Sequence, residues 1–93
     1  MSDDVQHNVE AQRYELVRED GTAFAAYEQQ GNVLIATSTV TPPALRGQGL
    51  ASRLIKHLLA DARAQGLKVV PQCSFVADYI ARHPEEQDLL ATR

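Results

Sequence analysis

The sequence predicts a small α/β fold: a three-stranded antiparallel meander, a crossover helix, a parallel fourth strand and C-terminal helices. Two turn signals, Asp20-Gly21 and Gly31-Asn32, separate β-like runs and predict hairpins. Leucines then recur every fourth residue from Leu50 to Leu58, which is the period of an amphipathic helix. Because a short apolar run follows this helix, the order strand–helix–strand predicts a right-handed crossover between parallel strands.

Size, charge and cysteine content limit the classes of function. The chain has 93 residues, of which 44% are hydrophobic and 23% charged, as expected of one small globular domain. Its net charge of −3 gives no broad basic field, which argues against a nucleic-acid partner. No apolar run reaches membrane-spanning length, so we expect no membrane association. Cys73 is the single cysteine, and without an internal disulfide partner it favours a reducing cytoplasm.

The meander is predicted from alternation and turn residues. Residues 1–12 are polar and aperiodic, and we expect them to be a flexible leader before a single domain at residues 13–93. In the first strand Tyr14 and Leu16 share one face. The predicted strands are Arg13–Arg18, Thr22–Gln29 and Val33–Thr41, the last ended by Pro42-Pro43.

A long helix and a fourth strand follow. The helix is predicted from about Gly49 to Gln65, with its charged side chains (Arg53, Lys56, Asp61 and Arg63) facing water. The fourth strand is predicted over Lys68–Gln72 and contains Pro71, which has no N–H for a ladder. Pairing with the third strand is therefore interrupted there, and parallel strands that separate near their ends open a cleft between them.

The C-terminal part predicts two short helices. The first, Ser74–Arg82, ends at His83-Pro84, and Pro84 suits the first position of the second. The side chains expected to pack against the core are Phe75, Val76, Tyr79 and Ile80 in the first helix and Leu89 and Leu90 in the second.

The most informative segment is Leu45-Arg46-Gly47-Gln48-Gly49-Leu50-Ala51, here called the glycine bend, which joins the third strand to the long helix. Two glycines allow a tight turn and leave backbone N–H groups uncovered by side chains. The helix N-terminus adds partial positive charge and Arg46 a cation, so the bend suits an anion such as a diphosphate. It lacks the third glycine of a dinucleotide fingerprint and the Gly-Lys-Ser/Thr of a P-loop. A turn that needs glycine for geometry alone is the alternative interpretation.

The wider pattern of spaced residues resembles a known family. The matching residues are Thr39-x-x-Pro42-Pro43-x-x-x-Gly47-Gln48-Gly49-Leu50-Ala51, Val69-x-Pro71-x-Cys73-Ser74-Phe75-Val76, Tyr79 and His83-Pro84-Glu85. Together they are similar to the GCN5-related N-acetyltransferase superfamily, and specifically to its small, single-domain YjdJ-type branch. Within the bend, Arg46-x-x-Gly49-x-Ala51 is similar to the acyl-CoA pyrophosphate motif of that superfamily. The resemblance covers roughly residues 13 to 91.

The resemblance implies a truncated acetyltransferase fold that binds acetyl-CoA. The pyrophosphate is then expected on backbone N–H groups of the bend, and the pantetheine arm in the cleft between the third and fourth strands. The residues expected to bind the coenzyme are Thr39, Val40 and Thr41 in the third strand and Arg46, Gly47, Gln48, Gly49, Leu50 and Ala51 in the bend. No set of His, Cys and carboxylate residues has metal-ligand spacing, so we expect no metal.

Two residues are candidates for the chemistry. Cys73 follows the fourth strand, where the cleft is expected to open. Its possible roles are those of an acid, a base or a nucleophile, and the alternative is a small buried apolar residue. In full-size relatives a tyrosine in the region of Tyr79 often protonates the leaving thiolate; the alternative for Tyr79 is a core position. Family members commonly carry a histidine where this chain has Ser38, which removes one candidate base.

These observations lead to one main hypothesis and two alternatives. The main hypothesis is a cytoplasmic N-acetyltransferase that transfers acetyl from acetyl-CoA to an exposed amine. The short chain leaves little sequence for a dedicated acceptor pocket, so a protein lysine, a polyamine or another small amine would fit. The alternatives are a non-catalytic CoA-binding module that acts through protein contacts, and a structural domain that binds no nucleotide.

Overall fold

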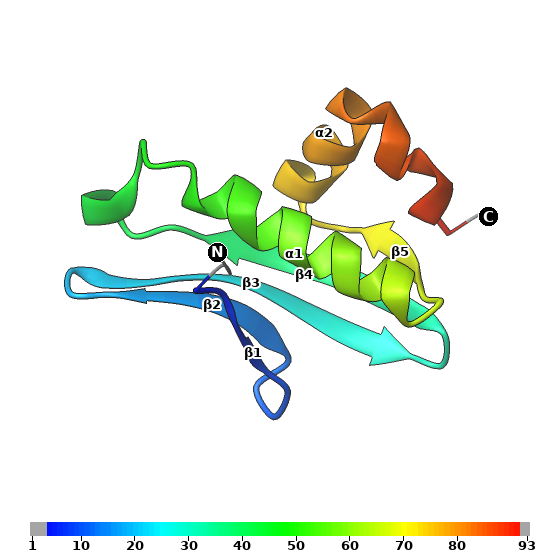
Figure 1. Cartoon of the computed structure of the whole chain (residues 1–93), viewed down its shortest axis with the longest axis horizontal. Helices are drawn as coiled ribbons and strands as arrows, with labels where there is room; N and C mark the ends of the chain where they lie inside the picture. Colours follow the sequence, from blue (N-terminus) through cyan, green and yellow to red (C-terminus); the bar gives the residue numbers. More distant parts are fainter. Residues whose placement is uncertain (1–3, 92–93) are drawn as a thin grey trace.

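A computed structural model describes residues 4–91 and contains one mixed sheet with its helices. Four consecutive strands pair antiparallel, and the fifth pairs parallel with the fourth (Figure 1). The strands are β1 (Gln6–Asn8), β2 (Arg13–Arg18), β3 (Gly21–Gln30), β4 (Val33–Val40) and β5 (Lys68–Pro71). The helices are α1 (Leu50–Ala64) and α2 (Ser74–Arg82), with 3-10 turns η1 (Pro43–Leu45) and η2 (Pro84–Leu89). The predicted α/β class and crossover are thus confirmed.

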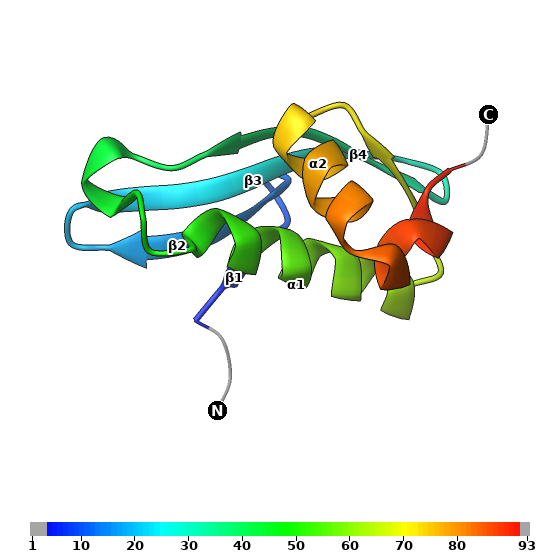
Figure 2. The same cartoon turned by 90° about the horizontal axis from the view of Figure 1, so that it is seen from above.

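The core lies between one face of the sheet and the helices that cover it (Figure 2). Alternation places Tyr14 and Leu16 of β2 on this face, while Phe24 of β3 lies on the other and is half-buried. Helix α1 buries the predicted stripe against them: Leu50, Leu54, Ile55, Leu58, Leu59 and Ala62 are each at most 3% exposed. Helix α2 adds Val76 and Ile80 to the same cluster. On the opposite face of the sheet a charged and an apolar side chain lie together, with the Arg13 guanidinium 4.3 Å from the Phe24 ring centroid.

Strand β1 differs from the prediction of a flexible leader over residues 1–12, of which residues 1–3 lie outside the described part of the chain. Gln6–Asn8 pairs with Arg13–Glu15 of β2, and His7 stacks on Tyr14 with ring centroids 4.1 Å apart. The His7 Nε2 atom also lies 2.6 Å from the Tyr27 hydroxyl. Three residues give no readable periodicity, so this strand forms because of tertiary contacts that the sequence pattern does not show.

Asp61 on α1 also differs from the prediction that it faces water. It is half-buried, and its Oδ2 atom accepts a hydrogen bond from the Tyr14 hydroxyl at 2.9 Å. Burial, followed by this hydrogen bond, raises the pKa of Tyr14, so the phenol stays neutral. The contact satisfies the polar end of an otherwise buried ring and fixes α1 on the sheet.

The ladder between β4 and β5 ends as the proline predicts. Its last pair is Ala36 with Pro71, and β4 continues to Val40 without a β5 partner in the register. The β3–β4 register shifts between Ala26, opposite Ser38, and Tyr27, opposite Ala36. Thr37 is therefore the extra residue of a bulge, and a bulge re-aims the side chains that follow it.

The C-terminal segment closes the edge of β5. The predicted last helix is the 3-10 turn η2, which buries Leu89. Arg63 of α1 donates to Asp88 at 2.8 and 2.9 Å and to Glu86 at 3.2 Å. Ala91 N–H then donates to the Val69 carbonyl at 2.9 Å, beside a parallel bridge from Val69 to Leu90.

The buried stripe of α1 predicts where stability resides. Replacing Leu54 (0% exposed) by alanine should lower the free energy of unfolding by about 2–5 kcal/mol, because it leaves a cavity at the centre of the core. The control Lys56→Ala, on the exposed side of the same helix, should change it by about 0.5 kcal/mol or less. Urea unfolding followed by circular dichroism measures both. Equal unfolding midpoints for the two variants would contradict this packing.

Candidate functional site

The glycine bend is built from a proline-started turn followed by two left-handed glycines. Gly47 has φ +85° and Gly49 has φ +72°, a region that side chains other than glycine rarely adopt. An ideal Cβ at either position meets no atom within 4 Å, so the backbone borders open space. The glycines are therefore required by conformation and leave room for a ligand beside the main chain.

The first turn of α1 presents its amides to this space. Gly49 is the N-cap, and the first intrahelical bond runs from Arg53 N–H to the Gly49 carbonyl at 3.2 Å. The N–H groups of residues 50–52 consequently point out of the helix end, and the first turn carries no acidic residue. A helix end of this kind attracts an anion through its amides and its dipole.

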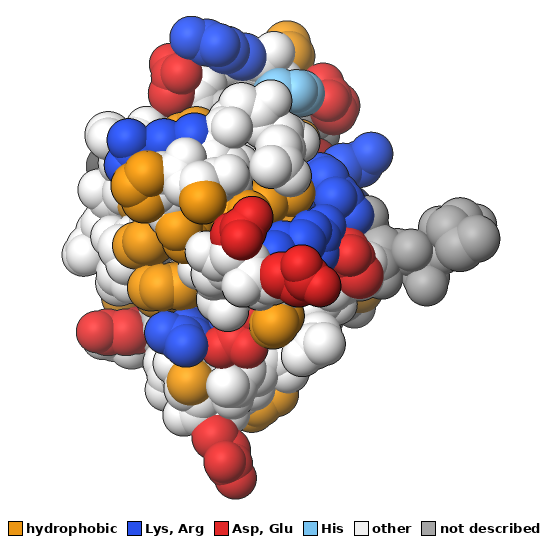
Figure 3. All heavy atoms as spheres, turned by 90° about the vertical axis from the view of Figure 1, so that its left-hand side faces the viewer, with side chains coloured by type: hydrophobic (Ala, Val, Ile, Leu, Met, Phe, Trp, Pro, Cys, Tyr) orange, Lys and Arg blue, Asp and Glu red, His pale blue; other side chains and the backbone are white. Residues whose placement is uncertain are grey.

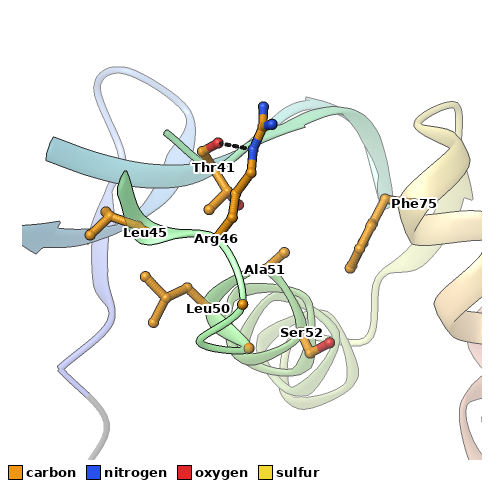
Figure 4. A pocket seen from close by; sticks show the side chains of 9 residues that line it. Thr41, Leu45, Arg46, Leu50, Ala51, Ser52 and Phe75 are labelled. Carbon is orange, nitrogen blue, oxygen red and sulfur yellow. Dashed lines mark hydrogen bonds between the residues drawn. The ribbon is translucent and has the colours of Figure 1, made fainter. Parts of the chain in front are cut away.

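A cavity of about 290 Å³, here called the bend cavity, lies against these amides. The residues that line it are Thr41, Leu45, Arg46, Gly47, Gly49, Leu50, Ala51, Ser52 and Phe75. Figure 4 shows Arg46 extending from the bend, with its Nε donating to the Thr41 carbonyl at 3.3 Å. The cavity at the helix end is thus lined both by the bend and by the start of α2, whose Phe75 lies across the cavity (Figure 4).

Most residues expected to bind the coenzyme border this cavity, and others lie apart from it. Thr41, Arg46, Gly47, Gly49, Leu50 and Ala51 are in the lining. Gln48 and Val40 are exposed, and Val40 pairs with Phe24. Thr39 lies two positions before Thr41 on β4 and contacts Cys73 instead.

Thr39 and Cys73 form a polar pair where β4 and β5 separate. The Thr39 Oγ1 and Cys73 Sγ atoms are 3.4 Å apart, and Cys73 N–H donates to the Ala36 carbonyl at 2.9 Å. Cys73 is also the N-cap of α2. Burial raises the pKa of the Cys73 thiol, but hydrogen bonds from the Thr39 hydroxyl and from the N–H groups of Val76 and Phe75 lower it by more. The net pKa lies below that of an ordinary cysteine, which favours the thiolate.

Tyr79 lies in a different part of the site from Cys73. It lines a groove between α1 and α2 and stacks on His83, with ring centroids 3.9 Å apart. Burial, followed by the charges of Glu86 and Glu85, raises the pKa of Tyr79, so its hydroxyl stays protonated at neutral pH. The structure therefore groups Cys73 with Thr39 and Tyr79 with His83.

Phe75 corrects the prediction that the apolar residues of α2 are all core. Val76 and Ile80 are buried, Tyr79 is half-buried, and Phe75 is 42% exposed and borders the bend cavity. Sequence reasoning missed Phe75 and Ser52 as cavity residues. A signal for Phe75 was its place off the Val76–Ile80 stripe, directly after the point where the strands separate.

Arg53 has carboxylate contacts in the structure. Its Nη2 donates to Asp4 Oδ1 at 2.8 Å, and Asp4 Oδ2 accepts from Arg18 at 2.8 Å. The end of the molecule that carries the bend shows apolar side chains interspersed with basic and acidic groups (Figure 3). The chain as a whole has a net charge of −3, so any attraction of an anion to the bend must come from groups close to it, such as Arg46.

The family model described as GCN5-related N-acetyl-transferase matches residues 13–89. The chain therefore belongs to the GCN5-related N-acetyltransferase family, whose members use acetyl-CoA as cosubstrate. Assignment to the YjdJ-type branch stays a prediction. The sheet with β4 parallel to β5 agrees with a truncated form of the family fold. Open space beside Gly47 and Gly49, next to outward-facing amides, fits a diphosphate.

Two further findings concern metal-binding groups and membrane-spanning helices in the described residues. Among residues 4–91, no group of three or more His, Cys, Asp or Glu side chains is arranged to hold a metal ion. Within the same range, no helix has both the length and the apolar character needed to cross a membrane.

The Thr39–Cys73 contact predicts the reactivity of the thiol. Thr39→Val removes the hydroxyl that lowers the thiol pKa, so the pH at which alkylation by iodoacetamide reaches half its maximal rate should rise. The matched control Ser38→Ala, at the exposed neighbouring position, should leave that pH unchanged. A profile that does not move in Thr39→Val would show that the hydroxyl leaves the thiolate unaffected.

Proposed function

We propose that this protein transfers the acetyl group of acetyl-CoA to an exposed amine. The observation that carries the proposal is that the bend cavity and the Thr39–Cys73 pair lie close together along the end of β4. Thr41 lines the cavity, and Thr39, two residues earlier, contacts Cys73. Alternate residues of extended backbone share a face, so the proposed anion site and the thiol would lie along the same side of this segment.

The diphosphate of the coenzyme would be held by the glycine bend. The amides of residues 50–52 and the open backbone at Gly47 and Gly49 supply donors, and Arg46 supplies a cation at the cavity wall. Apart from Arg46, these donors are main-chain groups, so the affinity would depend on the conformation of the bend more than on particular side chains.

The pantetheine arm would follow β4. Residues 37–40 extend beyond the last β4–β5 pair, so this edge of the strand can hydrogen-bond an extended ligand as it would a neighbouring strand. The backbone at Thr39, Val40 and Thr41 would align the arm, with Phe75 as an apolar wall. In this arrangement the thioester would lie toward Cys73.

The coenzyme supplies an acetyl thioester, and the chain's own groups would supply positioning and proton transfer. In the overall reaction a bond forms from the amine nitrogen to the acetyl carbon, the carbon–sulfur bond breaks, the nitrogen loses a proton and the sulfur gains one. Cys73, whose pKa is lowered, would accept the proton from the amine. Tyr79 keeps its proton and is the candidate donor to the departing thiolate.

The acceptor would be an exposed amine of a protein lysine, a polyamine or a small molecule. Ser38, where relatives commonly have histidine, is exposed and pairs with Ala26 on the face of the sheet opposite the helices. A serine hydroxyl is not a base at neutral pH, so this position offers no help in deprotonating the amine. That observation favours the second candidate function, a CoA-binding module without turnover that acts through protein contacts.

The role of the glycine bend can be tested by adding a negative charge to it. Gly49→Asp should abolish the rise in Tm that acetyl-CoA produces in the wild type, because a carboxylate beside the open amides repels a diphosphate. Gly31→Asp is a matched control, since Gly31 also has positive φ and open space around its Cβ position but lies in the β3–β4 turn. Its Tm should still rise with acetyl-CoA. An equal rise in wild type and Gly49→Asp would mean that the bend is only a turn.

Turnover can be tested by release of free thiol from acetyl-CoA in the presence of lysine peptides, spermidine and small amines. Cys73→Ala should slow release by about 100-fold or more while acetyl-CoA still raises the Tm, because proton transfer is lost and binding is kept. Tyr79→Phe tests the proton donor in the same way, with Ser74→Ala as a control for the start of α2. Binding without thiol release from the wild type with any amine would support the module in place of the enzyme.

A further inference from the structure

Tyr79, the candidate proton donor, borders a hollow between the two helices. This hollow has a volume of about 110 Å³, and its lining includes Ser52, Phe75, Tyr79 and His83. Ser52 and Phe75 also line the bend cavity, so the two spaces adjoin. Tyr79 therefore lies in the wall of a space next to the one proposed for the coenzyme.

The ring of Tyr79 is restricted by a second ring. A general acid works only if its hydroxyl stays within hydrogen-bond reach of the atom that it protonates. Tyr79 is half-buried, so packing against the core covers only part of its side chain. The His83 imidazole adds a stack on the Tyr79 ring, with centroids 3.9 Å apart and an interplanar angle of 13°. This second contact limits the rotation of the phenol.

The His83 side chain and its backbone are both held in place. The Nδ1 atom lies 2.7 Å from the Tyr79 carbonyl, which can only accept, so Nδ1 carries the proton. The His83 N–H donates to the Ile80 carbonyl at 3.1 Å, and the His83 carbonyl accepts from the Glu86 N–H at 2.8 Å. Because both the ring and the main chain of His83 are bonded, the imidazole is a rigid support for its neighbour.

The alternative role of His83 is to cap the end of α2. His83 is the C-cap residue, and its Nδ1–H satisfies a carbonyl of the last turn. Capping requires a donor but no ring, since a side-chain amide also donates to a carbonyl. The near-parallel stack on Tyr79 is therefore the observation that points beyond the cap.

We propose that His83 is a positioning residue that holds the Tyr79 ring where its hydroxyl protonates the departing thiolate. The inference rests on the proposed function, in which Tyr79 is the proton donor. As the carbon–sulfur bond breaks, its electron pair goes to the sulfur, and the Tyr79 O–H proton moves to that sulfur. The phenolate then takes a proton from water. His83 neither gives nor takes a proton in this step.

The release of free thiol from acetyl-CoA, with lysine peptides, spermidine or small amines, tests the positioning. His83→Asn removes the ring and keeps a side-chain donor. It should lower kcat about 10-fold, because a misplaced donor slows the chemical step. The KM for acetyl-CoA should stay within about 2-fold, because ligand binding is kept. The control His57→Asn removes an imidazole that lies against Tyr14 and should keep the wild-type kcat.

Combined variants separate positioning from capping. In a Tyr79→Phe background, His83→Asn should have no further effect on kcat, because the group that it positions is already gone. His83→Phe restores a ring that can stack but has no donor for the carbonyl, and it should recover most of the kcat that His83→Asn loses. A capping role predicts the opposite order, with His83→Asn close to the wild type and His83→Phe lower in both Tm and kcat.

Proton NMR of the Tyr79 ring measures the stack itself, whether or not turnover occurs. The ring current of the His83 imidazole should shift the Tyr79 ring protons upfield in the wild type, because the two rings lie nearly parallel. His83→Asn should remove this shift. His57→Asn should leave it in place.

Three results would overturn the positioning role while leaving the proposed function intact. The first is wild-type kcat in His83→Asn. The second is a full further loss of kcat when His83→Asn is combined with Tyr79→Phe. The third is a Tyr79 ring shift that does not move in His83→Asn. If the wild type bound acetyl-CoA but released no thiol with any of these amines, the proposed turnover would fail, and the role of His83 with it.

Discussion

The end of the β4–β5 ladder at Ala36 and Pro71 is the constraint on which the site depends. Proline cannot donate to a ladder, and the bulge at Thr37 turns the end of β4 so that Thr39 contacts Cys73. If the strands stayed paired, the edge of β4 beyond Ala36 would be covered by β5. The core holds this opening in place, because α1 and α2 both pack on the same face of the sheet.

The site concentrates its attraction for anions in a few groups. The chain has a net charge of −3, so a diphosphate gains nothing from the overall field. The amides at the start of α1 and Arg46 at the bend cavity would act over short distances instead. This arrangement suits a diphosphate, and it agrees with membership of a family that uses acetyl-CoA.

Much of the site could be predicted because its signals are local. The glycine bend depends on positive φ at Gly47 and Gly49, and residue type alone indicates that conformation. The break after Pro71 follows from a missing N–H. The partners of the thiol could not be predicted, since Thr39 and Cys73 are 34 residues apart and meet only through the register of β4 and β5.

The sequence by itself determined the order of β2 to β5, the buried stripe of α1 and the position of the bend, because each is set by periodicity or by the backbone limits of glycine and proline. Tertiary structure decided the rest. It ordered β1 through His7 and the two tyrosines, placed Asp61 against Tyr14, and left Phe75 exposed beside the bend. These outcomes depend on how helices and strands distant in the chain pack together, which no local pattern encodes.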